Sequence, residues 1–465
     1  MGTNALGLKG FLTVSILISL ALNLGLSHSE SLQIDSGLDV ASSNFSSSND
    51  TQELRRSDFP KDFIFGVATS AYQVEGAVGE GGRGTTIWDT FTNTPGKISD
   101  NTTAAVTADQ YHHYEADVEL IKELNMDAYR FSIAWSRIIP GIVPYVTLYH
   151  WDLPQPLEGN FGGWVNPEIV KHFTYFADTC FATFGDRVKH WITFNEPTQF
   201  CVNGYGTGLH APGRTSDRTL SSSGNSSTEP YLAAHNVLIA HATVADIYRS
   251  NYKHQEGRIG FTIDCDWTEP LSDSEEDKKA TERRRAFQLG WWLDPIFFGD
   301  YPSLMRQYVG DRLPQFTEAE RSLLNNSLDF VGLNHYTTRW VTSQPLPLNP
   351  AQSNPLMDQG VLTTGVDEFN NGTLPIGDAL KDTRRVNYYR DYIISMHQAI
   401  QNGADVRAYM AWSLLDNFEW AVGFTSRFGL YYVDYTTQKR YAKDSAKWFS
   451  NFLQYEDAYS EDRRH

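Results

Sequence analysis

Residues 191–197 read Trp-Ile-Thr-Phe-Asn-Glu-Pro, an apolar and β-branched run that ends abruptly in an amide and a carboxylate. The first four residues are typical of a buried strand. In a (β/α)8 barrel the reacting groups lie where the parallel strands end, at the C-terminal face. The segment therefore predicts a barrel strand over Trp191–Phe194, with Asn195 and Glu196 at its functional end.

The same pattern repeats between Phe59 and Leu453, where short β-branched or aromatic runs alternate with amphipathic helical stretches. Such alternation is typical of βα units around a parallel sheet. No break in composition divides the chain, so residues 58–455 are predicted to form one α/β domain, a (β/α)8 TIM barrel. The expected strands are Phe63–Thr69, Ala128–Ile133, Tyr145–Tyr149, Trp191–Phe194, Ile259–Ile263, Phe330–Asn334 and Ala408–Ser413. The expected helices include Ala108–Leu124, Pro167–Phe184, Tyr231–Asn251, Thr281–Leu289 and Arg384–Asn402.

Polar and aromatic residues gather at the ends of six of these strands. Any one of them could be structural, since buried amides and imidazoles are usually satisfied within the core. Six such groups at successive strand ends are hard to explain by packing alone, and they predict a ligand site. They are Gln73, Arg137, His150 with Trp151, Asn195 with Glu196, Asn334–Tyr336, and Trp412–Trp420.

The chain of 465 residues is acidic, with 56 Asp and Glu against 38 Lys and Arg and a formal net charge of −18. The resulting field repels phosphate backbones and anionic membrane surfaces, which argues against nucleic acid as a partner. The 12 Trp, 24 Tyr and 26 Phe offer flat apolar faces on which sugar C–H groups can pack, although most such rings belong to an ordinary core.

The N-terminus has the three-part layout of a cleavable signal peptide. Lys9 precedes a broken apolar stretch from Phe11 to Leu26, and small and polar residues follow. We expect a signal peptide over residues 1–29; a membrane anchor is the alternative, but the apolar stretch is short for a span. Residues 30–57 are rich in Ser, Asn and Asp, which predicts a disordered leader, and residues 456–465 form a C-terminal tail.

Six Asn-x-Ser/Thr triplets suit a glycoprotein of the secretory pathway, although such triplets also arise by chance. The chain ends in no ER-retention tetrapeptide, so an extracellular, vacuolar or ER-derived compartment is expected. The candidate glycosylation sites are Asn44, Asn49, Asn101, Asn225, Asn325 and Asn371.

The cysteines and short motifs indicate no prosthetic group. Cys180, Cys201 and Cys265 are an odd number without metal or disulfide spacing, so we expect buried thiols, with one bridge as the alternative. No glycine-rich nucleotide loop and no cluster of metal ligands stands out. We therefore predict no cofactor and no metal.

Taken in order, the strand-end motifs resemble those of family 1 glycoside hydrolases, most of all plant β-glucosidases, from about Phe59 to Phe452. Residues 193–197, TFNEP, resemble the segment that holds the family's general acid/base, which the resemblance places at Glu196. That group protonates the leaving glycosidic oxygen and then activates water. The structural alternative is a salt-bridged barrel carboxylate. Myrosinase relatives carry Gln at this position, so Glu196 implies O-glucosides rather than thioglucosides.

The resemblance also implies a set of sugar-binding residues and a small-molecule β-glucoside as the ligand. A pyranose presents adjacent hydroxyls and an apolar face, which polar side chains and indole rings can match. The residues carried over are Gln73, His150, Asn195, Tyr336, Trp412, Glu419, Trp420 and Phe428.

The first departure from the resemblance follows the second strand. Only residues 138–143 separate the Ser-Arg pair from the next strand segment, whereas a parallel crossover needs on the order of a dozen residues. The loop and helix that the resemblance implies are missing. We expect one flank of the barrel to expose apolar surface.

The second departure concerns the segment that carries the catalytic nucleophile in the family. The family has a strand ending in Thr-Glu-Asn-Gly, whose Glu is the nucleophile, and this chain has no such motif. Residues 364–368 resemble the sequence just after it. Retaining glycosidases need two carboxyls about 5 to 5.5 Å apart, and only Glu196 is supplied. Asp367 and Glu368 lie in a polar loop where solvated charge is the default. Arg130, implied to position the nucleophile, loses its partner.

We therefore expect an incomplete barrel, a β-glucosidase by descent whose activity is severely impaired. A non-catalytic sugar-binding protein is one alternative, and a splice product that does not fold stably is another. Both departures are clean, with family-like sequence on either side, which resembles omitted exons or an error in the gene model.

Overall fold

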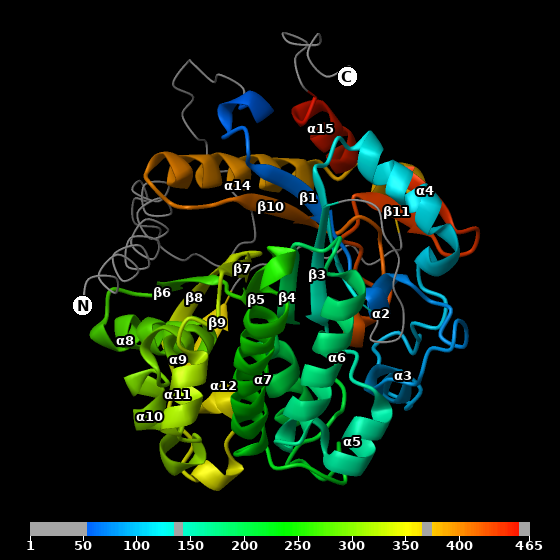
Figure 1. The fold of residues 1–465 in the computed structure, drawn as a ribbon. Coiled ribbons are helices and arrows are strands. Elements are labelled where there is room, and N and C mark those ends of the chain that lie inside the picture. Colours follow the sequence, from blue (N-terminus) through cyan, green and yellow to red (C-terminus); the bar gives the residue numbers. More distant parts are fainter. Residues whose placement is uncertain (1–53, 134–142, 365–373, 455–465) are drawn as a thin grey trace.

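The computed structural model of the protein describes residues 54–133, 143–364 and 374–454. Seven strands form one curled sheet in the order β10-β1-β2-β3-β4-β5-β7, and all neighbours are parallel (Figure 1). All seven expected strands are confirmed, with ends shifted by no more than two residues. They are β1 (Ile64–Ala68), β2 (Ala128–Ser132), β3 (Val143–Tyr149), β4 (His190–Asn195), β5 (Arg258–Asp264), β7 (Phe330–Asn334) and β10 (Ala408–Trp412).

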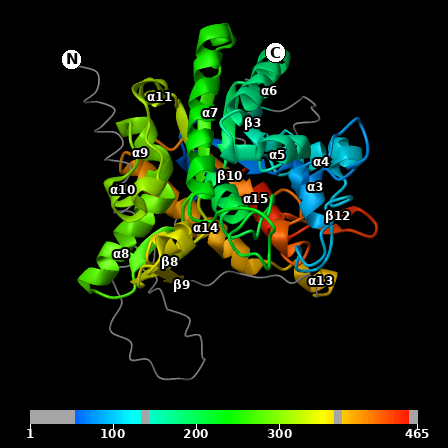
Figure 2. The same cartoon turned by 90° about the horizontal axis from the view of Figure 1, so that it is seen from below.

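Helices cover the outer side of this sheet, and the long pair α6 and α7 lies side by side (Figure 2). The longer helices are α4 (Gln110–Glu123), α6 (Ile169–Phe184), α7 (Glu229–Asn251), α8 (Glu275–Arg285) and α14 (Thr383–Gln401). The shorter ones are α2 (Ala71–Val74), α3 (Ile87–Thr92), α5 (Gln155–Phe161), α9 (Trp291–Phe298), α10 (Ser303–Val309), α11 (Glu318–Leu324), α12 (Pro355–Asp358), α13 (Ile376–Ala379) and α15 (Asp444–Phe452). The sheet with its helical cover is a (β/α)8 barrel that lacks one strand in the described part of the chain.

One expected helix, Thr281–Leu289, is placed wrongly. Helix α8 begins six residues earlier, at Glu275, because the hydroxyl of Ser274 accepts a hydrogen bond from the backbone N–H of Asp277 at 3.2 Å and caps the helix. A π-helical turn over Ala286–Gly290 then separates α8 from α9. The apolar periodicity of 281–289 therefore spans the end of one helix and a wider turn.

Five short strands lie outside the barrel and were not expected. Strands β6 (Trp267–Pro270), β8 (Thr338–Ser343) and β9 (Val361–Thr364) form a small sheet beside α8, and β11 (Tyr431–Asp434) pairs with β12 (Lys439–Ala442). Strand β9 is antiparallel to β8, so it does not replace the missing barrel strand. Four of these five strands have only four residues, too few positions to show an alternating pattern in the sequence.

Aromatic packing fills the barrel from both sides. On the outer side, Phe173 of α6 packs at 4.5 Å from Phe194 of β4. Inside, the rings of Tyr145 and His190 stack at 4.1 Å, and the ring of Phe330 lies over Gly260, where a Cβ would come within 2.3 Å of it. Apolar burial of this kind is the main favourable term in folding.

The ordered domain begins earlier than the expected end of the leader at residue 57. Arg56 is buried, and its guanidinium donates to the carbonyl of Phe63 at 2.6 Å. Composition alone could not reveal that contact. The signal peptide, most of the leader and the tail lie outside the described residues.

The three cysteines are free, with Cys180 and Cys201 buried and Cys265 half-buried, which confirms the thiol interpretation over the bridge. Asn101, Asn225 and Asn325 are exposed, whereas Asn44, Asn49 and Asn371 lie outside the described residues. Within the described ranges, no helix is both long and apolar enough for a membrane span.

The flank beside the first departure is covered better than expected. Strands β2 and β3 pair directly, from Ala128 with Val143 to Ser132 with Thr147, and residues 134–142 between them lie outside the described ranges. The rings of Tyr129 and Phe131 pack against each other at 5.3 Å and are half-buried rather than exposed.

Candidate active site

Hydrogen bonds join four strand ends at the C-terminal face of the barrel. The amide Nδ2 of Asn334 donates to Oε1 of Glu196 and, at 3.2 Å, to Oδ1 of Asn195. The Asn195 amide lies 3.1 Å from Nε2 of His150, and the guanidinium of Arg130 donates to the same Asn195 oxygen. Asn195 is therefore the hub that connects β2, β3, β4 and β7.

Glu196 is buried at the end of β4, with its backbone N–H bonded to the carbonyl of Thr262 at 2.8 Å. Burial raises the pKa of its carboxyl to about 7, and the nearby carboxylate of Asp264 acts in the same direction, while Asn334 and Arg130 oppose the shift. A carboxyl that titrates near neutral pH can both give and take a proton, as general acid/base chemistry requires.

Arg130 has only neutral hydrogen-bond partners in the described part of the chain. Its Nε lies 3.3 Å from Oγ1 of Thr147, and its other hydrogen bond goes to the amide of Asn195. Burial lowers the pKa of the guanidinium. Among the described residues, Arg130 therefore lacks a hydrogen-bonded carboxylate, as the sequence predicts.

Gln73 fixes the loop that follows β10. Its fully buried amide Nε2 shares its two hydrogens among three acceptors within hydrogen-bonding distance, Oδ1 of Asn417 at 3.0 Å, the carbonyl of Phe418 at 3.0 Å and Oε2 of Glu419 at 3.2 Å. Its oxygen accepts from the hydroxyl of Ser70 at 2.6 Å. Gln73 thus holds three consecutive residues of the loop with a single amide nitrogen.

Several buried polar atoms of the site have no hydrogen-bond partner in the described structure. Two of them are Oε1 of Glu419 and Nδ1 of His150. Burial raises the pKa of Glu419 to about 8, and burial together with Arg130 holds the pKa of His150 well below its usual range. Since buried polar groups are nearly always hydrogen-bonded, these two atoms are suited to the hydroxyls of a ligand.

Aromatic rings form a wall beside these polar groups. The indole of Trp420 lies 4.3 Å from that of Trp151 and 4.7 Å from that of Trp88, and it stacks on Tyr72 at 5.9 Å. The imidazole of His150 lies nearly parallel to Trp420 at 5.9 Å. A pyranose needs an apolar face and a row of polar groups together, and this arrangement provides both.

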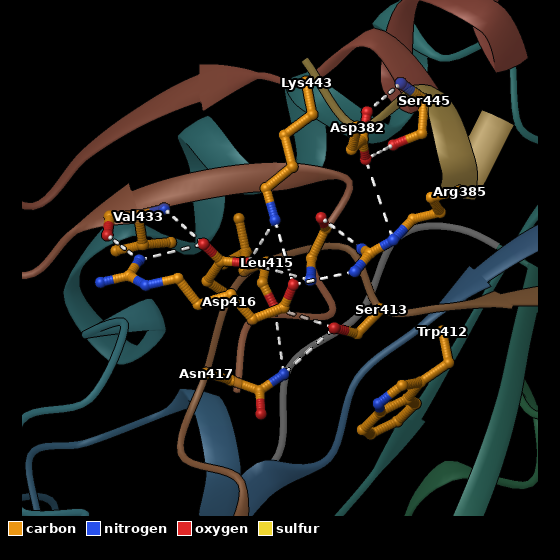
Figure 3. A network of polar contacts seen from close by, with 12 residues as sticks. Asp382, Arg385, Trp412, Ser413, Leu415, Asp416, Asn417, Val433, Lys443 and Ser445 are labelled. Carbon is orange, nitrogen blue, oxygen red and sulfur yellow. Dashed lines mark hydrogen bonds and ion pairs between the residues drawn. The ribbon is translucent and has the colours of Figure 1, made fainter. Parts of the chain in front are cut away.

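A buried charge cluster around Asp416 holds the loop that follows β10 (Figure 3). The carboxylate of Asp416 accepts from Nζ of Lys443 at 2.7 Å, from Nη1 of Arg427 at 3.0 Å and from the backbone N–H of Gly429 at 3.0 Å. Asn417 turns back to donate to the carbonyl of Leu415 at 3.0 Å. These contacts fix residues 413–420 and therefore the position of Glu419 and Trp420.

Three residues of the site have left-handed backbone conformations, namely Trp151 at φ 78°, Glu196 at φ 47° and Trp420 at φ 50°. For bulky L-residues this region costs roughly 1 to 2 kcal/mol each, and it persists only where the surroundings hold it. Such strain is found preferentially at functional sites, and no sequence pattern revealed it here.

The remaining described candidates come from the residues just after β7, from β10 and from the loop after β10. Tyr336 is 45% exposed beside β7, and Phe428 is half-buried, with its ring 6.0 Å from the guanidinium carbon of Arg385. Trp412 ends β10, and its indole lies 6.2 Å from the imidazole of His150. Arg137, Asp367 and Glu368 lie outside the described residues.

Sequence reasoning missed Asp264, a buried acid at the end of β5 that accepts from Nε2 of Gln199 at 3.0 Å. Its proximity to Glu196 helps to raise the pKa of the latter. Its place directly after the expected strand Ile259–Ile263 was the signal that could have revealed it.

Comparison with known proteins agrees with the geometry. The sequence model of glycosyl hydrolase family 1 matches residues 55–141, 141–364 and 360–458. The chain belongs to this family. Beta-glucosidase 34 of Oryza sativa subsp. japonica is 46% identical over 87% of the chain and 94% of its own length, and Beta-glucosidase 40 of Arabidopsis thaliana is 46% identical over 86% and 93%.

Solved structures of family 1 β-glucosidases share the fold. The rice β-glucosidase Os3BGlu6, solved as a mutant in a covalent complex with Glc, has a TM-score of 0.83 at 44% identity, covering 86% of this chain and 100% of its own. The enzyme of the fungus Humicola insolens in complex with glucose has a TM-score of 0.81 at 38% identity, covering 85% and 98%. The expected family and barrel fold are confirmed.

Proposed function

We propose that the ancestral, full-length form of this chain is a retaining β-glucosidase that removes terminal, non-reducing β-D-glucosyl residues from O-glucosides. The observation that carries the proposal is the buried Glu196, with a pKa of about 7, beside the unpartnered polar atoms that Glu419 and His150 have in the described structure. The relatives named as β-glucosidases support it.

In this reaction Glu196 would protonate the glycosidic oxygen while the bond from the anomeric carbon to that oxygen breaks. A carboxylate on the opposite face of the sugar would form the glycosyl ester, and Glu196, now ionised, would take a proton from the water that hydrolyses the ester. Neutral His150, Gln73 and Glu419 would hold the ring hydroxyls, and Trp420 would pack against the sugar.

The activity of the present chain is proposed to be severely impaired. The family match breaks at residue 141 and near residues 360–364, the two places where the sequence departs from the family pattern. The alignment with Beta-glucosidase 34 runs over 479 positions, more than the 465 residues of this chain, although it covers only 87% of them. The alignment therefore contains more positions than residues of this chain, and at the additional positions the relative has residues that this chain lacks.

A non-catalytic sugar-binding protein is the second candidate, and the assembled binding groups favour it. Gln73, His150, Glu419 and Trp420 are all positioned without help from the missing segment. Calorimetric titration of the folded chain with a β-glucoside tests it, and the absence of saturable heat would rule it out.

The third possibility is a splice product that does not fold stably. Hydrogen exchange tests it, since a protected barrel core would exclude such a product.

We also propose that the chain follows the secretory pathway. The exposed positions of Asn101, Asn225 and Asn325 support glycosylation there. Expression in plant cells followed by enzymatic removal of N-glycans should shift the electrophoretic mobility of the protein. An unchanged mobility and an intact N-terminus would contradict the proposal.

Restoring the missing strand tests the catalytic proposal. A segment with alternating apolar residues that ends in Thr-Glu-Asn-Gly is inserted after Thr364, and the matched control carries Gln in place of that Glu. We expect hydrolysis of an aryl β-glucoside by the first protein and not by the second. Absence of turnover from a restored protein with a protected barrel core would contradict the proposed function.

A further inference from the structure

The barrel sheet has two open edges. Strand β7 pairs with β5 and strand β10 pairs with β1, and in the described part of the chain neither has a strand on its other side. A closed barrel has no edges, because its first and last strands pair. Within the described ranges, no strand pairs with the backbone N–H and C=O groups on the outer sides of β7 and β10.

One helix contacts both edges. On α14, the hydroxyl of Tyr388 donates to the carbonyl of Tyr336, just after β7, at 3.0 Å. The hydroxyl of the next residue, Tyr389, donates to the carbonyl of Trp412, at the end of β10, at 2.9 Å. Since two consecutive residues reach both strands, the C-terminal ends of β7 and β10 lie near each other. Figure 1 shows α14 running beside β10.

Apolar side chains are uncovered along the opening. Val331 and Leu333 of β7 are 39% and 46% exposed, whereas Phe261 and Ile263, their register partners on β5, are fully buried. Exposed apolar residues along an unpaired strand edge are a template for pairing with another chain.

A buried cation, Arg130, lies at the end of the opening without a hydrogen-bonded carboxylate among the described residues. Its guanidinium donates to the same Asn195 oxygen that accepts, at 3.2 Å, from Nδ2 of Asn334, the last residue of β7, so Arg130 lies near the C-terminal end of that strand. A carboxylate arriving at the C-terminal end of the opening would meet this guanidinium. A charge-assisted hydrogen bond in a buried place is stronger than the bond to a neutral amide.

We propose that the opening between β7 and β10 is a docking site for one extended segment of another polypeptide, parallel to both strands, with alternating apolar side chains and a glutamate at its C-terminal end. β7 and β10 have 5 residues each, which sets the length of segment that can pair on both sides. The requirement for a glutamate rests on the proposed function, whereas the pairing of the backbone does not. Segments that add a strand gain affinity from backbone hydrogen bonds and specificity from alternate side chains.

The test is fluorescence anisotropy of short labelled peptides titrated with the full chain. A peptide of alternating apolar residues that ends in Glu should bind saturably. Replacing its central residue by Pro, which removes a ladder donor, should abolish binding. Replacing its Glu by Gln should weaken binding about tenfold, which corresponds to about 1.4 kcal/mol.

Variants of the chain locate the binding site. Leu333→Asp, at an exposed position of β7, should weaken binding of the Glu peptide about tenfold, whereas Phe298→Asp, 54% exposed at the end of α9, should leave it unchanged. Equal binding of the Pro peptide, or no effect of Leu333→Asp, would overturn the inference.

Different results would overturn the docking site and the proposed function. Absence of peptide binding overturns the docking site, even if the chain with the strand restored hydrolyses glucosides. Binding of the Glu peptide with an inactive restored chain retains the docking site and overturns the proposed function. A chain that sediments as a dimer and does not bind the peptide would overturn the docking of a different polypeptide and assign the opening to a second copy.

Discussion

The guanidinium of Arg130 donates to the amide oxygen of Asn195, so a buried cation is held by a neutral side chain. The same oxygen also accepts from Nδ2 of Asn334 at 3.2 Å, which ties the cation to the hydrogen-bond group around Glu196. Removing a charge from water without an opposite charge is costly. Among the described residues, Glu196 is thus connected through Asn334 and Asn195 to a cation that lacks a hydrogen-bonded carboxylate.

Replacing this cation by an apolar residue should stabilise the protein. Arg130→Met keeps much of the volume, and Asn195 retains Asn334 as a donor to its oxygen. We expect the free energy of unfolding to rise by about 1 to 3 kcal/mol, because the penalty for burying the guanidinium is relieved. Urea denaturation followed by circular dichroism measures the change.

Arg427→Met is the matched control, since Arg427 is similarly buried but ion-paired with Asp416 at 3.0 Å. It should lower the free energy of unfolding. If Arg130→Met loses as much stability as the control, the expectation is wrong, and the charge of Arg130 is balanced by a favourable interaction in the folded protein.

The cluster around Asp416 should dominate the stability of the loop that follows β10. Asp416→Ala leaves the buried Lys443 without its carboxylate and Arg427 with one bond fewer. We expect a loss of about 3 to 5 kcal/mol, as for other buried pairs that lose one partner. Lys171→Ala, which removes the exposed pair with Glu168, should cost less than about 0.5 kcal/mol. Thermal and urea unfolding measure the loss of stability in the two variants, and equal losses would contradict the prediction.

Glu419 should make stability depend on pH. Its pKa is raised from 4.5 to about 8, so the folded state favours the protonated carboxyl. The stabilisation is complete below pH 4.5, and it is lost as the pH rises through about 8, because only the unfolded state releases the proton readily. Glu419→Gln removes this titration, and its free energy of unfolding should fall less steeply between about pH 5 and 8.

The exposed carboxylate of Glu168 provides the comparison for this pH series, and Glu168→Gln should keep the slope of the parent chain. Parallel curves for Glu419→Gln and the parent would mean that the Glu419 carboxyl stays ionised in the folded protein. The remaining slope in Glu419→Gln is expected to come from Glu196, whose pKa is also raised, to about 7.

Gln73 should control glucoside affinity through the loop. Gln73→Ala removes the donor of three hydrogen bonds to residues 417–419 and leaves the buried Asn417 oxygen with one donor fewer. We expect binding of a β-glucoside to weaken at least about tenfold in calorimetric titration. Gln344→Ala, at an exposed position before α12, should bind as the parent does. If Gln73→Ala binds the glucoside as tightly as the parent, the position of the loop does not control sugar binding.

The barrel strands could be predicted because each is a short, strongly apolar run with a polar end. Trp191–Phe194 shows this pattern, and the place of β4 between β3 and β5 follows from chain order. The polar residues at these ends could be predicted as a group for the same reason. Glu196 and Asn195 are neighbours in the sequence and stay neighbours in the site.

Other features depend on contacts between distant residues, which no local pattern contains. The bond between Gln73 and Asn417 joins positions 344 residues apart, and the left-handed backbone at Trp151 and Trp420 is imposed by packing. Asp264 escaped notice because its influence on Glu196 arises from burial at adjacent strand ends rather than from spacing. The absence of a nucleophile is a prediction that rests on the resemblance to a family and on no local pattern in the sequence.

The central claim is that this chain holds an acid/base and a sugar-binding site without a nucleophile. The most direct test is the initial rate of aryl β-glucoside hydrolysis by monodisperse mature protein, measured beside Glu196→Gln. We predict that the parent chain shows no turnover above that of Glu196→Gln. Turnover by the parent that disappears in Glu196→Gln would contradict the account, because a second carboxylate or a water route would then complete the reaction.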